Sequence, residues 1–248
     1  MSTGVYIPDR AFPYGIFTNI LMKRSEENGI AVIPDIKCKS PAEGDLIPED
    51  DAPDLAAELV EAGAPVISVV TESEHYGGSA KLLERIARSA KAPVLRKDFI
   101  KCRRQLEESV EMGASAVLLI ASMLEKDTLA RLAEDALMLG LEPLTEIHGF
   151  EDMEKTRDLG LHFIGINNRN ILRLETDEGT VATTERLIRY LPEDVFIVSE
   201  SSIQSPEDVR RAASAGAKAV LVGTAILKSP DPAEMYRMLA DASTTPVD

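Results

Sequence analysis

The chain has 248 residues, 44% of them hydrophobic, and a formal net charge of −15 from 42 acidic and 27 basic residues. The length suits one large domain, and the apolar fraction is enough for a sizeable core. The acidic balance argues against nucleic acid or an anionic membrane as a partner, because both require a basic surface. A small anionic ligand remains compatible with it, since such a ligand needs only a local cluster of positive groups.

Cysteine and histidine usage predicts neither a disulfide framework nor a metal site. Cys38 and Cys102 are far apart without C-x-x-C spacing, and the three histidines share no spacing typical of metal ligands. The N-terminus lacks the basic start and apolar run of a secretory signal, and no apolar stretch approaches the roughly 20 residues of a membrane span. We therefore expect a cytoplasmic protein without a metal.

From the N-terminus onward, a helical pattern over Phe17–Asn28 is followed by one repeated unit: an amphipathic helix, a glycine and a short apolar run. The segment "VEAGAPVISVV" is one example. The glycine suits a helix C-terminus, and continuous Val, Ile and Leu suit parallel strands covered on both faces. Strands are predicted at Ala31–Ile36, Val66–Val70, Val94–Arg96, Ala116–Ile120, Glu142–Glu146, Phe163–Ile166, Phe196–Ser199 and Ala219–Val222. Helices are predicted at Pro53–Ala62, Ala80–Ala90, Arg104–Met112, Lys126–Leu139, Glu151–Leu159, Thr183–Tyr190, Pro206–Ala215 and Pro232–Ala240.

Strands that alternate with helices in this way predict an α/β fold, the (β/α)₈ TIM barrel. The main alternative is a doubly wound open sheet, which should carry a glycine-rich phosphate loop after its first strand; "IKCKSP" is not one. No linker or low-complexity segment divides the chain. We therefore expect a single barrel domain over residues 1–248, with residues 1–29 forming an N-terminal extension and helix.

Polar residues gather where the predicted strands end, which is where barrel enzymes carry their active sites. They are Asp35, Lys37 and Ser40; Thr71 and Glu72; Lys97 and Asp98; Glu146; Asn167, Asn168 and Arg169; Ser199 to Ser202; and Gly223 and Thr224. Such a set around one mouth should have the shifted pKa values that acid–base chemistry needs. The small residues Ser202, Gly223 and Thr224 follow the last two strands, which indicates a phosphate site built on backbone N–H groups.

Several of these segments resemble the indole-3-glycerol phosphate synthase family of tryptophan biosynthesis. The matching segments are "IAVIPDIKCKSP", "SVVTESEHYGGS", "PVLRKDFI", "GASAVLLIA", "LEPLTEIH", "FIGINNRN", "IVSESSI" and "AVLVGTAIL", in family order from about residue 30 to 228. The resemblance implies a carboxy-lyase that works without a cofactor. It closes the ring of 1-(2-carboxyphenylamino)-1-deoxyribulose 5-phosphate, with loss of carbon dioxide and water.

The same resemblance implies roles for individual residues. Lys97 is the general acid that protonates the ketose oxygen, Lys37 pairs with the substrate carboxylate and later donates a proton, and Glu146 handles the proton moved during dehydration. Asp35 stands where the family has a catalytic glutamate. The implied substrate and phosphate contacts are Ser40, Tyr76, Phe99, Asn167, Arg169, Glu200 and Ser201, with Ser202, Gly223 and Thr224 around the phosphate. A lysine acid needs a lowered pKa, which crowding of Lys37, Lys39 and Lys97 would help to bring about.

The chain departs from the family pattern around the substrate. Asp35 is one methylene shorter than glutamate, and a misplacement of about 1 Å can cost about a hundredfold in rate. Other departures are Ala42, Glu74, His75, Tyr76, Ser202 and Ala225, together with a shorter N-terminal segment. Two alternatives therefore stay open: a paralogue with the same acid–base groups acting on a related phosphorylated or aromatic keto compound, and a non-catalytic ligand-binding barrel. For each, we expect a small phosphorylated anion as ligand, and a protein that works as a monomer or with other tryptophan-pathway enzymes.

Overall fold

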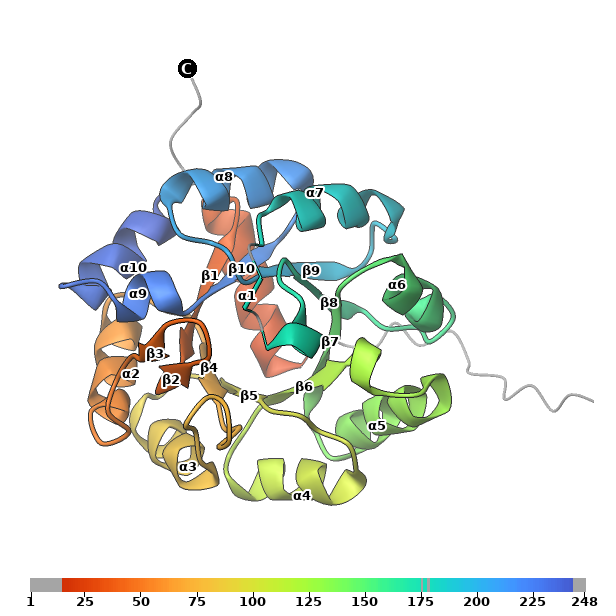
Figure 1. The fold of residues 1–248 in the computed structure, drawn as a ribbon, viewed down its shortest axis with the longest axis horizontal. Helices are drawn as coiled ribbons and strands as arrows, with labels where there is room; N and C mark the ends of the chain where they lie inside the picture. The colour runs from red at the N-terminus through yellow and green to blue at the C-terminus, as the bar shows by residue number, and fades with distance from the viewer. Residues whose placement is uncertain (1–14, 175, 178, 243–248) are drawn as a thin grey trace, which may run out of the picture.

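The computed structural model describes residues 15–174, 176–177 and 179–242. Eight parallel strands close into a barrel, and helices surround it (Figure 1). The closure is visible at β1 (Ala31–Ile36), which pairs with both β4 (Ile67–Val70) and β10 (Ala219–Val222). An open sheet would leave two unpaired edges, so the doubly wound alternative is wrong and the TIM-barrel prediction is confirmed.

All of the predicted strands and outer helices are present, with bounds that differ by a few residues. The other barrel strands are β5 (Val94–Lys97), β6 (Ala116–Ile120), β7 (Glu142–Ile147), β8 (Phe163–Asn167) and β9 (Phe196–Glu200). The outer helices are α2 (Ala52–Glu61), α3 (Ala80–Ser89), α4 (Arg103–Glu111), α5 (Lys126–Met138), α6 (Phe150–Thr156), α7 (Ala182–Leu187), α8 (Pro206–Ala215) and α10 (Pro232–Ala240).

The differences are confined to short or terminal pieces. Helix α6 ends at Thr156 rather than Leu159, because the chain tightens there into a turn in which the Leu159 amide donates to the Thr156 carbonyl. The predicted helix over Thr183–Tyr190 finishes as the 3₁₀ turn η3 (Ile188–Tyr190). The hairpin of β2 (Lys39–Ser40) and β3 (Gly44–Asp45) and the short helix α9 (Thr224–Leu227) were not predicted. Elements of two to four residues are too short to carry a hydrophobic period.

Helix α8 shows how local chemistry sets the element boundaries. The Ser205 hydroxyl accepts from the amide of Asp208 at 3.3 Å, and the Asp208 carboxylate accepts in return from the Ser205 amide at 3.1 Å. Pro206 occupies the first helical turn, where its missing N–H costs nothing. The helix then ends at Gly216, whose φ of 110° is the left-handed conformation expected of the repeated glycine.

The period-2 alternation of the strands divides the core into two parts. On β1, Val32 and Ile36 pack outward against the helices, whereas Ala31 and Ile33 face the barrel interior. The inward-facing apolar set includes Leu95, Leu118, Leu144, Phe163, Phe196, Val198 and Leu221. This interior is filled with side chains, so it forms a packed core rather than a channel.

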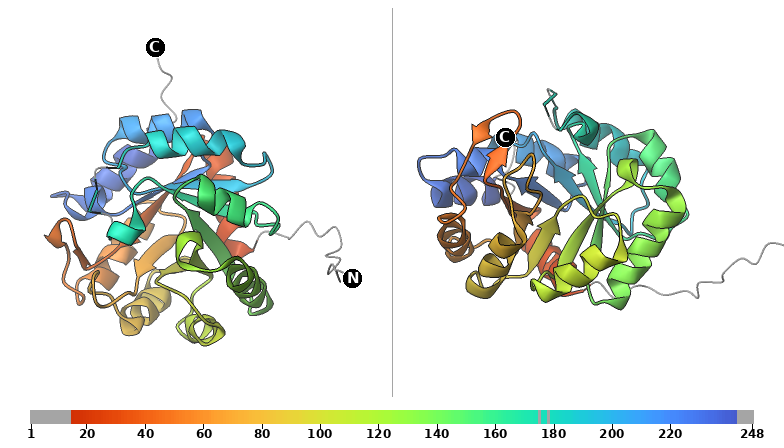
Figure 2. Two further views of the ribbon diagram at one scale, coloured as in Figure 1. Left: turned by 45° about the vertical axis from the view of Figure 1, so that its right-hand side comes forward. Right: turned by 60° about the horizontal axis from the view of Figure 1, so that its bottom comes forward.

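Helix α1 (Ile16–Asn28) closes one end of this interior. Its Phe17 side chain is fully buried in the inner core beside Phe163, with ring centroids 6.1 Å apart. The Glu142 carboxylate accepts from the amides of Phe17 at 2.6 Å and Thr18 at 3.0 Å, which satisfies two free N–H groups at the helix start. Figure 2 shows α1 at one end of the barrel and the β2–β3 hairpin at the other. The end away from α1 is therefore the one available for a site.

Within the described ranges, no helix combines the length and the apolar character needed to cross a membrane.

Candidate active site

The inward rows of the strands turn polar where the strands end. On β1 the row of Ala31 and Ile33 continues with Asp35 and Lys37, and on β5 it reaches Lys97. The same alternation brings in Glu146 on β7, Asn167 on β8, Glu200 on β9 and Gly223 after β10. Seven sequence-predicted residues therefore gather at one mouth because they share an inward face at the C-terminal ends of parallel strands.

An ion cluster lies at the centre of this mouth. The Lys97 ammonium nitrogen is 3.9 Å from Glu146 Oε2 and 3.7 Å from Glu200 Oε2. Both carboxylates are fully buried, and the Lys97 side chain is 11% exposed. Asn167 Nδ2 donates to Glu146 Oε2 at 3.2 Å. Buried charges need such partners, and two carboxylates beside one ammonium favour its charged form.

This arrangement changes the interpretation of Lys97. The sequence suggested crowding by other lysines, but Lys39 is exposed on the β2–β3 hairpin and does not line either pocket of the mouth. Lys97 instead forms ion pairs with the two glutamates. Lys97 is therefore held as a charged proton donor, with Glu146 as a candidate proton acceptor beside it.

Glu200 fits beneath Lys97 only because residue 165 is glycine. A Cβ built at Gly165 would lie 1.8 Å from Glu200 Oε1 and 3.0 Å from Glu200 Cδ. No side chain can occupy that space while the carboxylate is there. The glycine of the "GINNRN" motif thus serves the site by leaving room for a buried charge.

Asp35 is fixed by a residue that the sequence prediction missed. The Ser68 hydroxyl donates to Asp35 Oδ1 at 2.6 Å, and the barrel register places these two residues opposite each other on β4 and β1. Gly223 approaches from β10, where an added Cβ would lie 3.1 Å from the Asp35 carbonyl oxygen and 3.2 Å from Lys37 Cε. The Ser68 hydroxyl therefore anchors Asp35 to the barrel wall. Lys37 passes close to the backbone of the loop that follows β10.

Two adjoining pockets open at the mouth and share Asp35, Lys37 and Lys97. The first is mainly apolar, and its wall includes Val70, Tyr76, Phe99, Leu118, Ile120 and Ile171. The second is mainly polar, and its wall includes Glu43, Arg169, Ser201, Ser202, Gly223 and Thr224. An aromatic group fits the chemistry of the first pocket and an anion that of the second. The three shared residues lie at the junction.

The polar pocket is built on unusual backbone geometry. Ser201 and Ser202 have φ values of 62° and 58°, a left-handed conformation that is uncommon outside glycine. The Ser202 hydroxyl accepts from Arg169 Nε at 3.2 Å, so this serine tethers the guanidinium. Glu43 also lines the pocket, and its hydrogen bond with Lys228 holds the pKa of Glu43 below its usual value. Ser40 is buried on β2 and lines neither of these two pockets, so its expected contact with the substrate stays a prediction.

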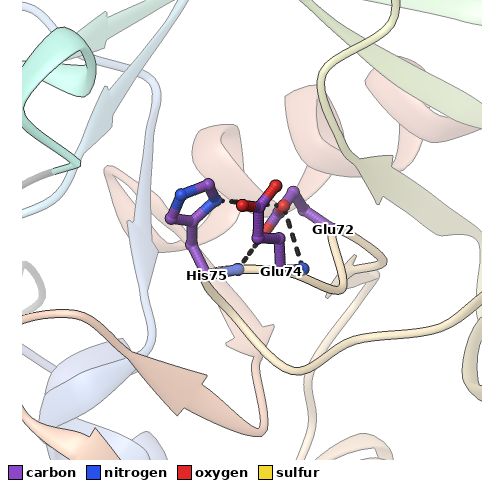
Figure 3. A group of neighbouring side chains, drawn as sticks. All are labelled: Glu72, Glu74 and His75. Carbon is purple, nitrogen blue, oxygen red and sulfur yellow. Dashed lines mark hydrogen bonds and ion pairs between the residues drawn. The ribbon is translucent and has the colours of Figure 1, made fainter.

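The loop after β4 is organised by Glu72, as Figure 3 shows. Its carboxylate accepts from the amides of Glu74 at 3.1 Å and His75 at 2.8 Å, and it also faces the His75 ring at 3.1 Å. The amide of Tyr76 donates to the same carboxylate at 3.1 Å. These contacts fix the turn that carries the buried Tyr76 side chain to the wall of the apolar pocket.

His148 is the second residue that the sequence prediction missed. Its Nε2 lies 3.2 Å from Glu146 Oε1, and its side chain is 14% exposed. Burial alone lowers the pKa of His148, but hydrogen bonds with Asp152 and Glu146 outweigh it and raise the pKa to about 10. The sequence does contain a pattern that could have identified His148. It comes two residues after Glu146, and residues two apart on a strand share one face.

Comparison with known proteins identifies the family. The sequence model of the family described as Indole-3-glycerol phosphate synthase matches residues 8–239. The chain belongs to the indole-3-glycerol phosphate synthase family. It is 39% identical over 220 residues to the indole-3-glycerol phosphate synthase of Thermococcus kodakarensis, which covers 89% of this chain and 95% of that protein.

Further members of the family are similarly close. The indole-3-glycerol phosphate synthase of Pyrococcus furiosus is 38% identical over 221 residues, 89% of this chain and 95% of that protein. The protein named indole-3-glycerol phosphate synthase 1 in Streptomyces coelicolor is 40% identical over 219 residues, 88% of this chain and 80% of that protein. The likeness therefore extends over most of the chain and includes every strand of the barrel.

Proposed function

We propose that this protein is an indole-3-glycerol phosphate synthase that acts on 1-(2-carboxyphenylamino)-1-deoxyribulose 5-phosphate. The observation that carries the proposal is the junction of the two pockets, where Asp35, Lys37 and Lys97 stand between an apolar and a polar space. The substrate has the same division, with an aromatic ring at one end and a phosphate at the other. The bond to be made joins the two halves, so the acid–base groups lie where the reaction needs them.

The reaction requires an acid first and a base later. The ring carbon that bears the carboxylate attacks the ketose carbonyl carbon, and the carbonyl oxygen takes a proton from the Lys97 ammonium. The carboxylate then leaves as carbon dioxide, and its bonding electrons return to the ring. Finally the new hydroxyl leaves as water with a proton from an ammonium group, and Glu146 takes the proton that the five-membered ring loses. Overall, one carbon dioxide and one water are released, and no oxidant or reductant is needed.

Positive groups at the mouth support binding of an anionic substrate by an acidic protein. Lys37 lines both pockets, so it can pair with the substrate carboxylate at the junction. Arg169 lines the polar pocket, where Ser201 and Ser202 present small side chains beside it. A local field of this kind binds a phosphate regardless of the net charge of −15. Phe99 and Tyr76 offer the aromatic half a complementary wall.

A direct assay tests the proposal. The purified protein is mixed with the carboxyphenylamino-deoxyribulose phosphate, and product is followed by indole fluorescence. Lys97→Met should abolish turnover, while Lys218→Met, an exposed lysine at the opposite end of β10, should leave it unchanged. No turnover by the wild-type protein, together with no binding of a reduced substrate analogue, would sink the proposal. Binding without turnover would instead favour a paralogue or a non-catalytic barrel.

A further inference from the structure

His148 connects carboxylates from two different elements. Its Nε2 faces Glu146 Oε1 of β7 at 3.2 Å, and its Nδ1 faces Asp152 Oδ2 of α6 at 3.4 Å. The Ser122 hydroxyl lies 3.3 Å from the same Nδ1, and the His148 amide donates to Asp152 Oδ2 at 2.9 Å. Each ring nitrogen therefore faces a carboxylate, at Nε2 as an ion-pair contact without hydrogen-bond alignment, and the backbone amide holds the residue to Asp152. Its orientation leaves one nitrogen for Glu146.

The two oxygens of Glu146 face different neighbours. Oε1 faces His148, whereas Oε2 accepts from Asn167 and lies 3.9 Å from the Lys97 ammonium. Lys97 lines both pockets, but His148 lines neither. The histidine thus stands behind Glu146, on the side away from the substrate. It can act on the reaction only through that carboxylate.

The charges around His148 come from four elements. Glu146 on β7 and Asp152 on α6 are the anions in contact with it. Lys155 on α6 is a cation in the same region. Its ammonium donates to the carbonyls of Ala121 at 2.6 Å and Leu124 at 3.0 Å, beside the 3₁₀ turn η1 (Ala121–Met123). Lys97 on β5 and Glu200 on β9 stand beyond Glu146. Two carboxylates that flank one imidazole favour its doubly protonated form, since only that form carries the positive charge that both attract.

We propose that His148 is a positioning residue which, as an imidazolium, keeps Glu146 ionised and directs its Oε2 toward Lys97 and the substrate. The inference rests on the proposed synthase reaction, in which Glu146 must be a free base when the ring loses its proton. Lys97 is shared between the buried carboxylates of Glu146 and Glu200. The imidazolium supplies a second positive charge, so that a buried acid and a buried base coexist at one pH.

The protonation of His148 can be measured without any turnover. The chain has three histidines, so imidazole signals in a nitrogen-15 NMR spectrum can be assigned from His148→Gln, His75→Gln and His162→Gln. At pH 8 in the ligand-free protein, we expect both nitrogens of His148 to be protonated, whereas an ordinary imidazole with a pKa near ~6.5 is neutral there. A neutral His148 at pH 8 overturns the inference.

Kinetics then separate a positioning role from a structural one. We expect His148→Gln to lose about tenfold in kcat, with KM within about twofold of the wild type. The acidic limb of its kcat–pH profile should move to higher pH by about one unit. Asp152→Asn, which keeps the imidazole, should shift the same limb in the same direction, and it serves if His148→Gln does not fold. His162→Gln, at the opposite end of the barrel, is the control. A lower melting temperature with an unchanged kcat and pH profile would mean that His148 is only structural.

Failure of this inference is distinguishable from failure of the proposed function. If the wild-type protein does not turn over the ring-closing substrate, the proposed function is wrong, and the NMR result still decides whether His148 is charged. If the wild type is active but His148→Gln is equally active with the same pH profile, the proposed function stands and the role of His148 is refuted.

Discussion

Gly165 on β8 is a position where one added methyl group should disturb the ion cluster directly. An added Cβ would lie 1.8 Å from Glu200 Oε1, whereas ordinary van der Waals contact begins at 3.4 Å. In Gly165→Ala the carboxylate oxygen must therefore move by roughly 1.6 Å. Leu144 Cδ1 already lies 3.5 Å from the new methyl position, so the methyl group has little freedom to give way.

The displacement acts directly on the ion cluster. Glu200 is fully buried and lies 3.7 Å from the Lys97 ammonium, so its movement changes the position of the proposed general acid. A misplacement of about 1 Å can cost on the order of a hundredfold in rate. We expect Gly165→Ala to lose about a hundredfold in kcat. Overpacking should also destabilise the fold by about 1–3 kcal/mol.

A double-mutant cycle tests the cause as well as the effect. Glu200→Ala removes the side chain that the new methyl group strikes. In that background Gly165→Ala should cost no more than about threefold in kcat, and most of the lost stability should return. Steady-state indole fluorescence gives the rates, and thermal unfolding gives the stabilities.

Gly149→Ala is the matched control, because the same methyl group there meets no heavy atom within 4 Å and the backbone is extended. We expect its kcat to stay within about twofold of the wild type. The steric argument is refuted if Gly165→Ala keeps activity within about threefold. It is also refuted if the losses from Gly165→Ala and Glu200→Ala multiply, because independent losses would mean that the methyl group does not act through the carboxylate.

Four further changes probe the mouth. Asp35→Glu restores the side-chain length of the family and should raise kcat; a fall would show that the shorter acid is tuned to this site. Ser202→Gly should raise the free energy of unfolding by about 1 kcal/mol by removing a left-handed serine, yet raise KM because Arg169 loses its tether; an unchanged KM would contradict that tether. Glu43→Gln removes a negative charge from the polar pocket and should lower KM by about threefold; a higher KM would contradict the placement of the phosphate there. The pKa of His148 is about 10 in the folded protein, above the value of about 6.5 in the unfolded chain. Protonated His148 therefore contributes its full stability to the fold below about pH 6.5, and this contribution is lost as the pH rises through about 10. Over that range the free energy of unfolding should therefore fall more in the wild type than in His148→Gln, and equal slopes would contradict the raised pKa.

The fold could be predicted where the signals are local. The run Ala116–Ile120 is continuous and apolar and follows Ser115, and it matches β6 residue for residue. Helix α8 was also predicted to the residue, because a serine cap and a proline mark its start and Gly216 marks its end. The β2–β3 hairpin escaped prediction because two-residue strands have no period.

The site could be predicted only in part. Asp35, Lys97 and Glu146 were found because each ends an inward-facing row. Ser40 lies on β2, where the chain has left the barrel wall and the strand alternation no longer fixes which way a side chain points, so its expected contact with the substrate stays a prediction. Ser68 was missed for a different reason: it faces Asp35 across a strand pair, and the register between strands 33 residues apart cannot be read from one sequence.

The ionised groups of the mouth explain how an acidic protein can bind an anionic substrate. The carboxylates of Asp35, Glu146 and Glu200 roughly offset the positive charges of Lys37, Lys97 and Arg169, so net charge alone does not favour the substrate. The three carboxylates are each held in place by neighbouring groups. Asp35 is bound back to the wall by the Ser68 hydroxyl, Glu146 is held between its amide and imidazole neighbours, and Glu200 lies buried in the space left by a glycine. Lys37, Lys97 and Arg169 line the open pockets together with Asp35, Glu43 and Glu146. Because neighbouring protein groups partly compensate the charges of Asp35 and Glu146, the positive groups at the mouth can still attract a phosphate and a carboxylate.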